Sequence, residues 1–230
     1  MTPFLGILML QTRFPRPPGD IGHPQTFAFP VRRVVVEDAV PRRVVHGNAV
    51  GLLDRFIASA QALVGEGACA IGTSCGFLAL HQRELAAALP APVATSSLLQ
   101  CAWLAPLLPA GRRCGIVTID AAALTDAHLA AVGAAADTPI EGVDRDGEFA
   151  TRLLNDEPTL DTTRAEAEVV EAARRLVRRR ADVGAIVLEC TNMPPYAAAV
   201  ARATGRPVFD VVTLLNWLWS GVARAEWTSK

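Results

Sequence analysis

The sequence predicts an α/β protein made of two pseudo-symmetric lobes, each a mostly parallel sheet flanked by helices, with the active site in the cleft between them. Short apolar runs alternate with helical stretches along the 230 residues, which is typical of βα units. A shift of 115 residues, half the length, aligns residues 70–99 with residues 185–214 at eight identical positions of thirty. In both copies a strand ends at a cysteine, Cys75 or Cys190, and a Pro-Val pair begins another strand seventeen residues later.

The first half begins with an apolar run at residues 4–10, which predicts a buried strand. The amino terminus has no basic start and no small-residue cleavage site, so it is not expected to be a secretion signal. Residues 11–47 contain nine prolines or glycines and predict a long irregular loop with one strand near 33–37. The remaining elements follow from apolar periodicity and breakers: a helix at 49–64, a strand at 68–73, a helix at 77–89, a strand opened by Pro92-Val93 and a helix at 98–108.

The second half repeats this alternation. A strand is expected at 115–119, a helix capped by Thr125 at 125–132, and mostly loop at 137–160. A long helix follows, from a cap at Asp161 or Thr162 to about residue 180. The last predicted elements are a strand at 185–188, a helix at 195–204, a strand at 207–209 and a helix at 211–223. This final helix is apolar nearly all round, which fits either a place in the core or a homodimer contact.

Composition excludes several classes of protein. Hydrophobic residues make up 51% and charged residues 20%, which supplies a core and rules out a disordered chain. The net charge of −1 and the 6% of aromatic residues argue against a nucleic-acid partner. No apolar run reaches the roughly 20 residues that cross a bilayer, so no membrane association is expected.

The cysteines and histidines predict a reduced, metal-free protein. Five cysteines, an odd number, without a secretion signal indicate free thiols and a cytoplasmic location. No Cys-x-x-Cys pair occurs and the four histidines are scattered, so no metal site is expected. No nucleotide-binding glycine motif occurs either, so no cofactor is expected.

Cys75 and Cys190 are the candidate catalytic residues, because both follow strands whose carboxyl ends would face one cleft. A thiol beside a helix N-terminus is expected to have a lowered pKa, and the free backbone N–H groups there attract anions. Two thiols on opposite faces of one carbon would permit stereoinversion, with one removing a proton and the other delivering one. Cys69, Cys101 and Cys114 lie within apolar stretches and are expected to be inert core residues.

At these residues the sequence resembles the aspartate/glutamate racemase superfamily, which includes hydantoin racemases, arylmalonate decarboxylases and maleate isomerases. The most specific segments are Gly-Thr-Ser-Cys at 72–75 and Cys-Thr-Asn at 190–192. The resemblance implies two catalytic thiols, Cys75 and Cys190, and a small carboxylate as the binding partner. It also implies that the carboxy-terminal strand and helix return to the first lobe, so that this lobe comprises 1–108 and 208–230 and the second comprises 109–207.

The resemblance further implies a set of substrate-binding residues. Thr73, Ser74 and Gly76 match the first carboxylate-binding turn, and Thr191 and Asn192 match the second. The remaining matches are at the ends of the first strand of each lobe: Gln11, Thr12 and Thr118.

Two departures from the family pattern bear on the substrate. The acidic residue near the first strand that serves an α-ammonium group is absent, and Glu189 stands where a glycine is common. Glu189 is expected either to replace that acidic partner or to pair with an arginine in the hinge. Arg13 and Arg16 are expected to be either ligands of a second carboxylate or exposed loop residues.

Three functions fit the sequence. The leading interpretation is a cofactor-independent racemase or epimerase of amino acids or related carboxylates, which uses both thiols. The second is a decarboxylase or a cis–trans isomerase, for which one cysteine is essential. The third is a non-catalytic protein that binds a small carboxylate.

Overall fold

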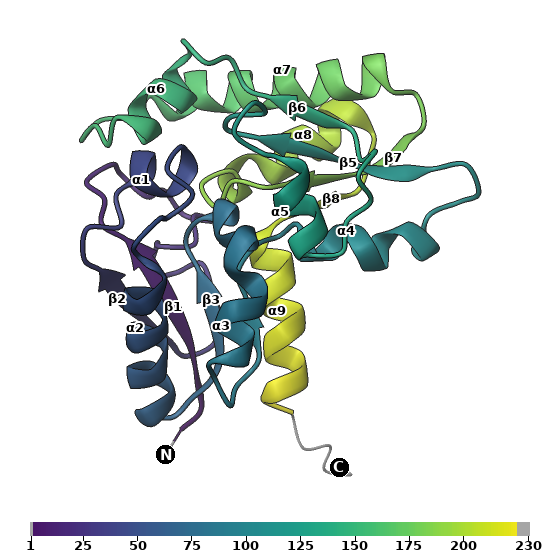
Figure 1. Cartoon of the computed structure of the whole chain (residues 1–230). Coiled ribbons are helices and arrows are strands. Elements are labelled where there is room, and N and C mark those ends of the chain that lie inside the picture. The colour runs from purple at the N-terminus through teal and green to yellow at the C-terminus, as the bar shows by residue number, and fades with distance from the viewer. Residues whose placement is uncertain (1, 225–230) are drawn as a thin grey trace, which may run out of the picture.

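Two parallel sheets, joined by one crossover helix, form the framework of the protein (Figure 1). The structure is a computed structural model and describes residues 2–224. The outer ends of the expected first lobe, Met1 and residues 225–230, lie outside the described residues. The predicted fold class, two α/β lobes, is confirmed.

Each sheet has four strands, and the strand orders of the two sheets correspond. The first sheet has the order β2-β1-β3-β4 and the second β6-β5-β7-β8. The strands of the first are β1 (Phe4–Leu10), β2 (Val31–Val36), β3 (Ala68–Thr73) and β4 (Val93–Ala94). Those of the second are β5 (Arg113–Thr118), β6 (Ile140–Gly142), β7 (Val183–Leu188) and β8 (Val208–Phe209). All pairs are parallel, so the carboxyl ends of the strands in each sheet share one edge.

The internal repeat holds at the level of register. Ile71 pairs with Val93, and 115 residues later Ile186 pairs with Val208. The central strands β1 and β5 also occupy equivalent places, and each shows a register shift at its start. Equal register is a stronger correspondence than shared helix–strand order, so the two lobes are copies of one arrangement.

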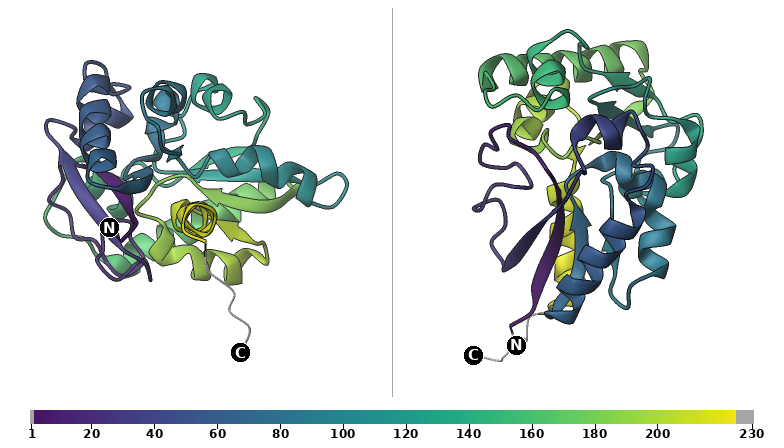
Figure 2. Two further views of the ribbon diagram at one scale, coloured as in Figure 1. Left: turned by 90° about the horizontal axis from the view of Figure 1, so that it is seen from below. Right: turned by 60° about the vertical axis from the view of Figure 1, so that its left-hand side comes forward.

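Helices cover both faces of the first sheet, which explains the uninterrupted apolar run of β1. Alternate β1 side chains point to opposite faces. One face packs with Phe56 and Leu63 of α2 (Leu53–Gly65). The other packs with Leu214 and Leu215 of α9 (Val211–Val222), which lies along this sheet and is seen end-on in Figure 2.

The second sheet is covered by amphipathic helices. The longest, α7 (Thr162–Arg179), is capped by the Asp161 carboxylate, which accepts from the backbone N–H groups of Thr163 and Arg164. Its apolar face is buried and consists of Ala165, Val169, Val170, Ala172, Ala173 and Leu176. The other helices of this lobe are α5 (Asp126–Ala131), α6 (Glu148–Leu154) and α8 (Ala197–Thr204). The crossover from β4 to β5 is α4 (Leu99–Leu104) and a 3₁₀ turn at Ala105–Leu107.

Several boundaries differ from the prediction. The helix expected at 77–89 is a 3₁₀ helix, Gly76–His81, followed by α3 (Gln82–Ala87), and the helix expected at 195–204 begins with 3₁₀ residues Pro194–Tyr196. Two segments expected to be loop contain short helices, α1 (Pro41–Val45) and α6. These helices are too short for a 3.6-residue period to be recognised in the sequence.

The carboxy-terminal segment also differs. The strand β8 pairs with β7 in the second sheet, so only α9 returns to the first lobe. The expected return at residue 208 therefore lies too early, because a two-residue strand signal does not reveal which sheet it joins. Within α9 only Val211, Leu214 and Leu215 are buried, and Trp217 is 56% exposed.

Within residues 2–224, no helix combines the length and the apolar character needed to span a bilayer.

Candidate active site

A cavity lies where the carboxyl ends of β1, β3 and β7 meet, between the two lobes. It offers about 30 Å³ of water-accessible space. Two turns, one from each lobe, form its polar wall: Ser74, Cys75, Gly76, Glu189, Cys190, Thr191 and Asn192. Its other wall is apolar: Leu10, Phe14, Pro41, Val45, Phe77, Ile119, Leu153 and Leu154. The internal repeat therefore brings both candidate cysteines to one cavity.

Cys75 is the residue between β3 and the following 3₁₀ helix, with extended backbone. Its side chain is buried, at 7% exposure. Burial raises the pKa of the Cys75 thiol to about 12, and the negative charge of Glu189 adds to the rise. The backbone N–H groups of Phe77 and Leu78 act in the opposite direction.

Cys190 occupies the equivalent position after β7 in the second lobe. Its thiol donates to the side-chain oxygen of Asn192, at 3.6 Å. Burial raises the pKa of Cys190 well above its ordinary value, and the charge of Glu189 is the second cause. The thiol of Cys75 lies close enough to contribute in the same direction.

The expected lowering of the two thiol pKa values is therefore wrong. That expectation assumed a helix N-terminus beside each cysteine, and short 3₁₀ turns stand there instead. Burial and a neighbouring carboxylate both favour the neutral thiol. Both thiols are thus protonated at neutral pH.

Glu189 is fully buried between the two cysteines. The Thr118 hydroxyl donates to Glu189 Oε2 at 2.7 Å, whereas Oε1 has no hydrogen-bond partner among the described residues. Burial raises the pKa of Glu189 to about 7, although the hydrogen bond from Thr118 lowers it. The described residues supply no arginine partner for Glu189, so the expected pairing with an arginine in the hinge is not found.

The predicted hydroxyl side chains are occupied in holding the two turns. Thr191 donates to the Ser74 carbonyl oxygen at 2.6 Å, which links the two lobes. The Ser74 hydroxyl accepts from the Leu10 backbone N–H at 2.8 Å, and Thr73 donates to the Thr95 carbonyl oxygen at 2.6 Å. Thr73 and Thr118 do not line the cavity themselves. The hydrogen bonds of Thr73, Ser74 and Thr191 therefore fix the positions of the two turns that carry the cysteines.

The first loop reaches the site through Asp20, which the sequence did not reveal. Asp20 is 1% exposed, and the Asn192 amide donates to it at 2.6 Å. Arg16 donates to both Asp20 and Thr12, at 2.9 Å each. The interpretation of Arg16 as an exposed loop arginine is therefore wrong, because Arg16 pairs with a buried carboxylate.

Gln11 and Thr12 do not line the cavity. The Gln11 side chain is exposed and accepts from the Asp38 backbone N–H at 3.0 Å. Arg13 is exposed and pairs with Asp156 of the other lobe at 3.2 Å. The first loop thus joins the lobes, and the residues of segment 11–47 that line the cavity are the apolar Phe14, Pro41 and Val45.

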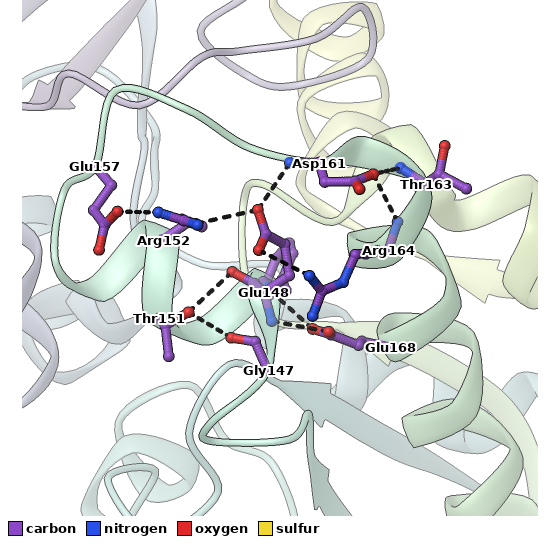
Figure 3. A network of polar contacts seen from close by, with 10 residues as sticks. Gly147, Glu148, Thr151, Arg152, Glu157, Asp161, Thr163, Arg164 and Glu168 are labelled. Atoms are coloured by element: carbon purple, nitrogen blue, oxygen red, sulfur yellow. Dashed lines mark hydrogen bonds and ion pairs between the residues drawn. The ribbon is translucent and has the colours of Figure 1, made fainter.

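A polar network fixes α6, whose Leu153 and Leu154 face the cavity (Figure 3). Glu148, at the start of α6, accepts from the Asp161 backbone N–H at 2.9 Å and from Arg152 at 3.2 Å. The carboxylate of Glu168 accepts from the backbone N–H groups of Glu148 and Phe149, at 2.8 Å each, and so caps α6. Glu148 and Arg152 lie in the segment expected to be mostly loop, whereas Asp161 and Glu168 belong to the predicted long helix and its cap. Charged residues in these places do not predict a cavity wall.

The carboxy-terminal half matches a family model. Residues 97–218 match the model described as Asp/Glu/Hydantoin racemase. This segment includes Thr118, Glu189 and Cys190.

Named relatives match nearly the whole chain. Dimethylsulfoniopropionate lyase 5 of Emiliania huxleyi is 27% identical over 235 residues, which are 95% of this chain and 45% of that protein. The dimethylsulfoniopropionate lyase of Durusdinium sp. clade D is 28% identical over 232 residues, 94% of this chain and 74% of that protein. The chain thus spans less than half of the first relative and about three quarters of the second.

Solved structures show the same fold. Allantoin racemase from Klebsiella pneumoniae superposes with a TM-score of 0.65 at 18% identity, over 100% of this chain and 91% of that chain. Unliganded arylmalonate decarboxylase superposes with a TM-score of 0.60 at 16% identity, over 100% of this chain and 96% of that chain. The family expected from the sequence is confirmed, and the named relatives and neighbours are enzymes.

Proposed function

The chain belongs to the Asp/Glu/hydantoin racemase family, and on that premise we propose that it is a lyase that removes the α-proton of dimethylsulfoniopropionate, or of a closely similar carboxylate, and eliminates the β-substituent. The observation that carries this proposal is the match to dimethylsulfoniopropionate lyases over 94–95% of the chain. A family assignment alone leaves the reaction open, since its members include racemases and a decarboxylase.

The chemistry needs one base beside the α-carbon. The reacting cysteine first loses its thiol proton to solvent, which the positive charge of the bound substrate favours. Its thiolate then takes the α-proton, the C–H electron pair forms the new double bond, and the Cβ–S bond breaks. Dimethyl sulfide leaves with the electron pair of the Cβ–S bond, and acrylate remains. The thiol then loses its proton to solvent, so that the reaction releases one proton. Stabilisation of the developing negative charge on the substrate carboxylate lowers the barrier of the first step.

The composition of the cavity supports a sulfonium substrate. Its wall carries two phenylalanines, Phe14 and Phe77, and five aliphatic residues besides one proline. A dimethylsulfonium group presents methyl groups and no hydrogen-bond donor, so it suits an apolar wall with aromatic faces. An α-ammonium group donates three hydrogen bonds, whereas Glu189 Oε1 is a single unpartnered side-chain oxygen of the described cavity lining.

Product analysis tests this proposal. Purified protein is incubated with dimethylsulfoniopropionate, dimethyl sulfide is measured in the headspace, and acrylate is measured by NMR. The expected result is equal amounts of both products. Absence of both, at protein concentrations that would reveal one turnover, would overturn the assignment.

A second candidate is a racemase or epimerase acting next to a carboxylate. The observation that favours it is the pair of cysteines at equivalent positions in the two lobes, which suits removal of a proton on one face and delivery on the other. Amino acids, hydroxy acids and hydantoins in deuterated water would reveal this activity as α-deuterium uptake. Single substitutions separate the two reactions: inversion needs both Cys75 and Cys190, whereas elimination needs one thiol as base.

A further inference from the structure

Glu189 carries an incompletely bonded carboxylate at the wall of the cavity. Its side chain is fully buried, its Oε2 accepts from Thr118, and its Oε1 has no partner within residues 2–224. Gly76 of the opposite lobe creates the space for this oxygen, because a Cβ at position 76 would overlap Glu189 Oε1 and the Glu189 carbonyl oxygen. Both residues line the cavity, so Oε1 lies where the two lobes meet.

The cavity provides no positive charge to balance this carboxylate. The ionisable groups of its lining are Glu189 and the thiols of Cys75 and Cys190, and the lining includes no lysine, arginine or histidine. Arg16 of the first loop, whose charge acts on Cys75, is already paired with Asp20 at 2.9 Å. A buried carboxylate without a counter-charge is unfavourable, and such a group is normally paired or protonated.

We propose that Glu189 is the counter-ion for a positively charged group of the substrate, so that the site selects carboxylates that also carry a fixed cation. The substrate then supplies the charge that the cavity lacks. A sulfonium or quaternary ammonium group fits a cavity with a single unpartnered oxygen on one wall and apolar side chains on the other, because it donates no hydrogen bonds and needs none. This inference rests on the proposed function for the reaction, and it assigns the residue that determines substrate class.

Protonation competes with cation binding at this residue. Burial raises the pKa of Glu189 to about 7. Near neutral pH, Glu189 is therefore protonated in a fraction of the molecules, and these lack the negative charge that would bind the cation. The titratable groups that face Glu189 are Cys75 after β3 and Cys190 after β7, and both thiols stay neutral there because their pKa values are raised. The Asp20–Arg16 pair beyond Cys190 carries no net charge. Binding of a cation should therefore lower the pKa of Glu189 and release a proton.

Matched ligands test the proposal without turnover. The cationic ligand, named for its fixed positive group, is the zwitterion 3-(trimethylammonio)propanoate, whose amine leaves far less readily than dimethyl sulfide. The cation-free ligand of the same shape is 4,4-dimethylpentanoate, in which a tert-butyl group replaces the trimethylammonium group. Calorimetry is expected to show at least tenfold tighter binding of the cationic ligand to the wild-type protein at pH 8. Its affinity should fall as the pH is lowered to 6, and its binding near pH 7 should release protons to the buffer.

Glu189→Gln removes the charge and keeps the shape. The preference for the cationic ligand is expected to fall to within twofold in this variant. Glu141→Gln is the matched control, because Glu141 is a mostly buried carboxylate of the same lobe, outside the cavity and paired with Arg175 and Arg179. This control should keep the wild-type preference.

The outcomes separate this inference from the proposed function. Equal affinity of the wild-type protein for the two ligands, or an unchanged preference in Glu189→Gln, would overturn the counter-ion role even if dimethyl sulfide is formed. A strong cation preference without dimethyl sulfide formation would refute only the lyase. If Glu189→Gln fails to fold, the pH dependence and proton release of the wild-type protein decide the question alone.

Discussion

The hydroxyl of Thr191 donates a hydrogen bond to the carbonyl oxygen of Ser74, at 2.6 Å, across the boundary between the lobes. Each of these residues is the neighbour of a candidate catalytic cysteine, Cys190 or Cys75. Both are buried, at 1% and 4% exposure, so water does not replace this bond. The distance between the two thiols is therefore coupled to one side chain–backbone contact.

Replacing Thr191 with valine should disturb the site and the stability together. The Ser74 carbonyl would be left buried without its donor, which costs about 1–3 kcal/mol of unfolding free energy. Misplacement of the two turns should also lower kcat roughly tenfold or more. Urea unfolding and a turnover assay measure the two effects. Thr191→Ser keeps the hydroxyl and should behave as the wild type, so equal losses in both variants would contradict this role.

Gly76 should not tolerate a side chain. A Cβ there would overlap the backbone carbonyl oxygen of Glu189, which cannot rotate away, as well as Oε1. We expect Gly76→Ala to lose about 1–3 kcal/mol of unfolding free energy, as overpacked sites do. Gly65→Ala is the control, because no atom lies within 4 Å of its added Cβ at the end of α2, and it should be neutral or slightly stabilising. A Gly76→Ala protein as stable as the wild type would show that the lobes separate easily.

Glu189 should make the protein less stable as the pH rises. Its pKa is about 7 in the folded state, against 4.5 for an exposed glutamate. Since the folded pKa is the higher one, the contribution of this group is fully present below about pH 4.5 and is lost as the pH rises through 7. The loss is on the order of 3 kcal/mol for a shift of this size.

The variant Glu189→Gln isolates that contribution. The unfolding free energy of the wild type relative to the variant should decrease between pH 4.5 and pH 8, as measured by urea unfolding in matched buffers. The subtraction cancels the titration of the other groups. A difference that stays constant over this range would mean that Glu189 does not change its charge there.

The arrangement of the lobes was predictable because it depends on local signals that occur twice. Strand ends at Cys75 and Cys190 and the Pro-Val pairs define the same register in both halves, and the structure repeats Ile71↔Val93 as Ile186↔Val208. The burial of α9 was not predictable in the same way. Its apolar surface exceeds the surface that the first sheet covers, so Trp217 stays exposed.

The electrostatics of the site could not be predicted from the sequence. The charge state of Glu189 depends on Thr118, 71 residues away, and on the space beside Gly76 in the other lobe. Asp20 likewise reaches Asn192 across 172 residues. Spacing along the chain does not reveal such contacts. Burial and the neighbouring carboxylate of Glu189 reversed the expected direction of the thiol pKa values.

Thr118 should set the pH at which the site becomes charged. Its hydrogen bond to Glu189 Oε2 lowers the pKa of that carboxyl, so Thr118→Val should raise this pKa further above about 7. At neutral pH, Glu189 is then protonated in a larger fraction of the variant molecules, and these do not bind a cation. We expect the affinity for 3-(trimethylammonio)propanoate to fall at pH 7 and to recover at higher pH, while the affinity for 4,4-dimethylpentanoate does not fall at pH 7. Thr118→Ser retains the donor and should keep the wild-type pH dependence. If Thr118→Val instead lowers the affinity for both ligands equally at every pH, Thr118 only shapes the cavity.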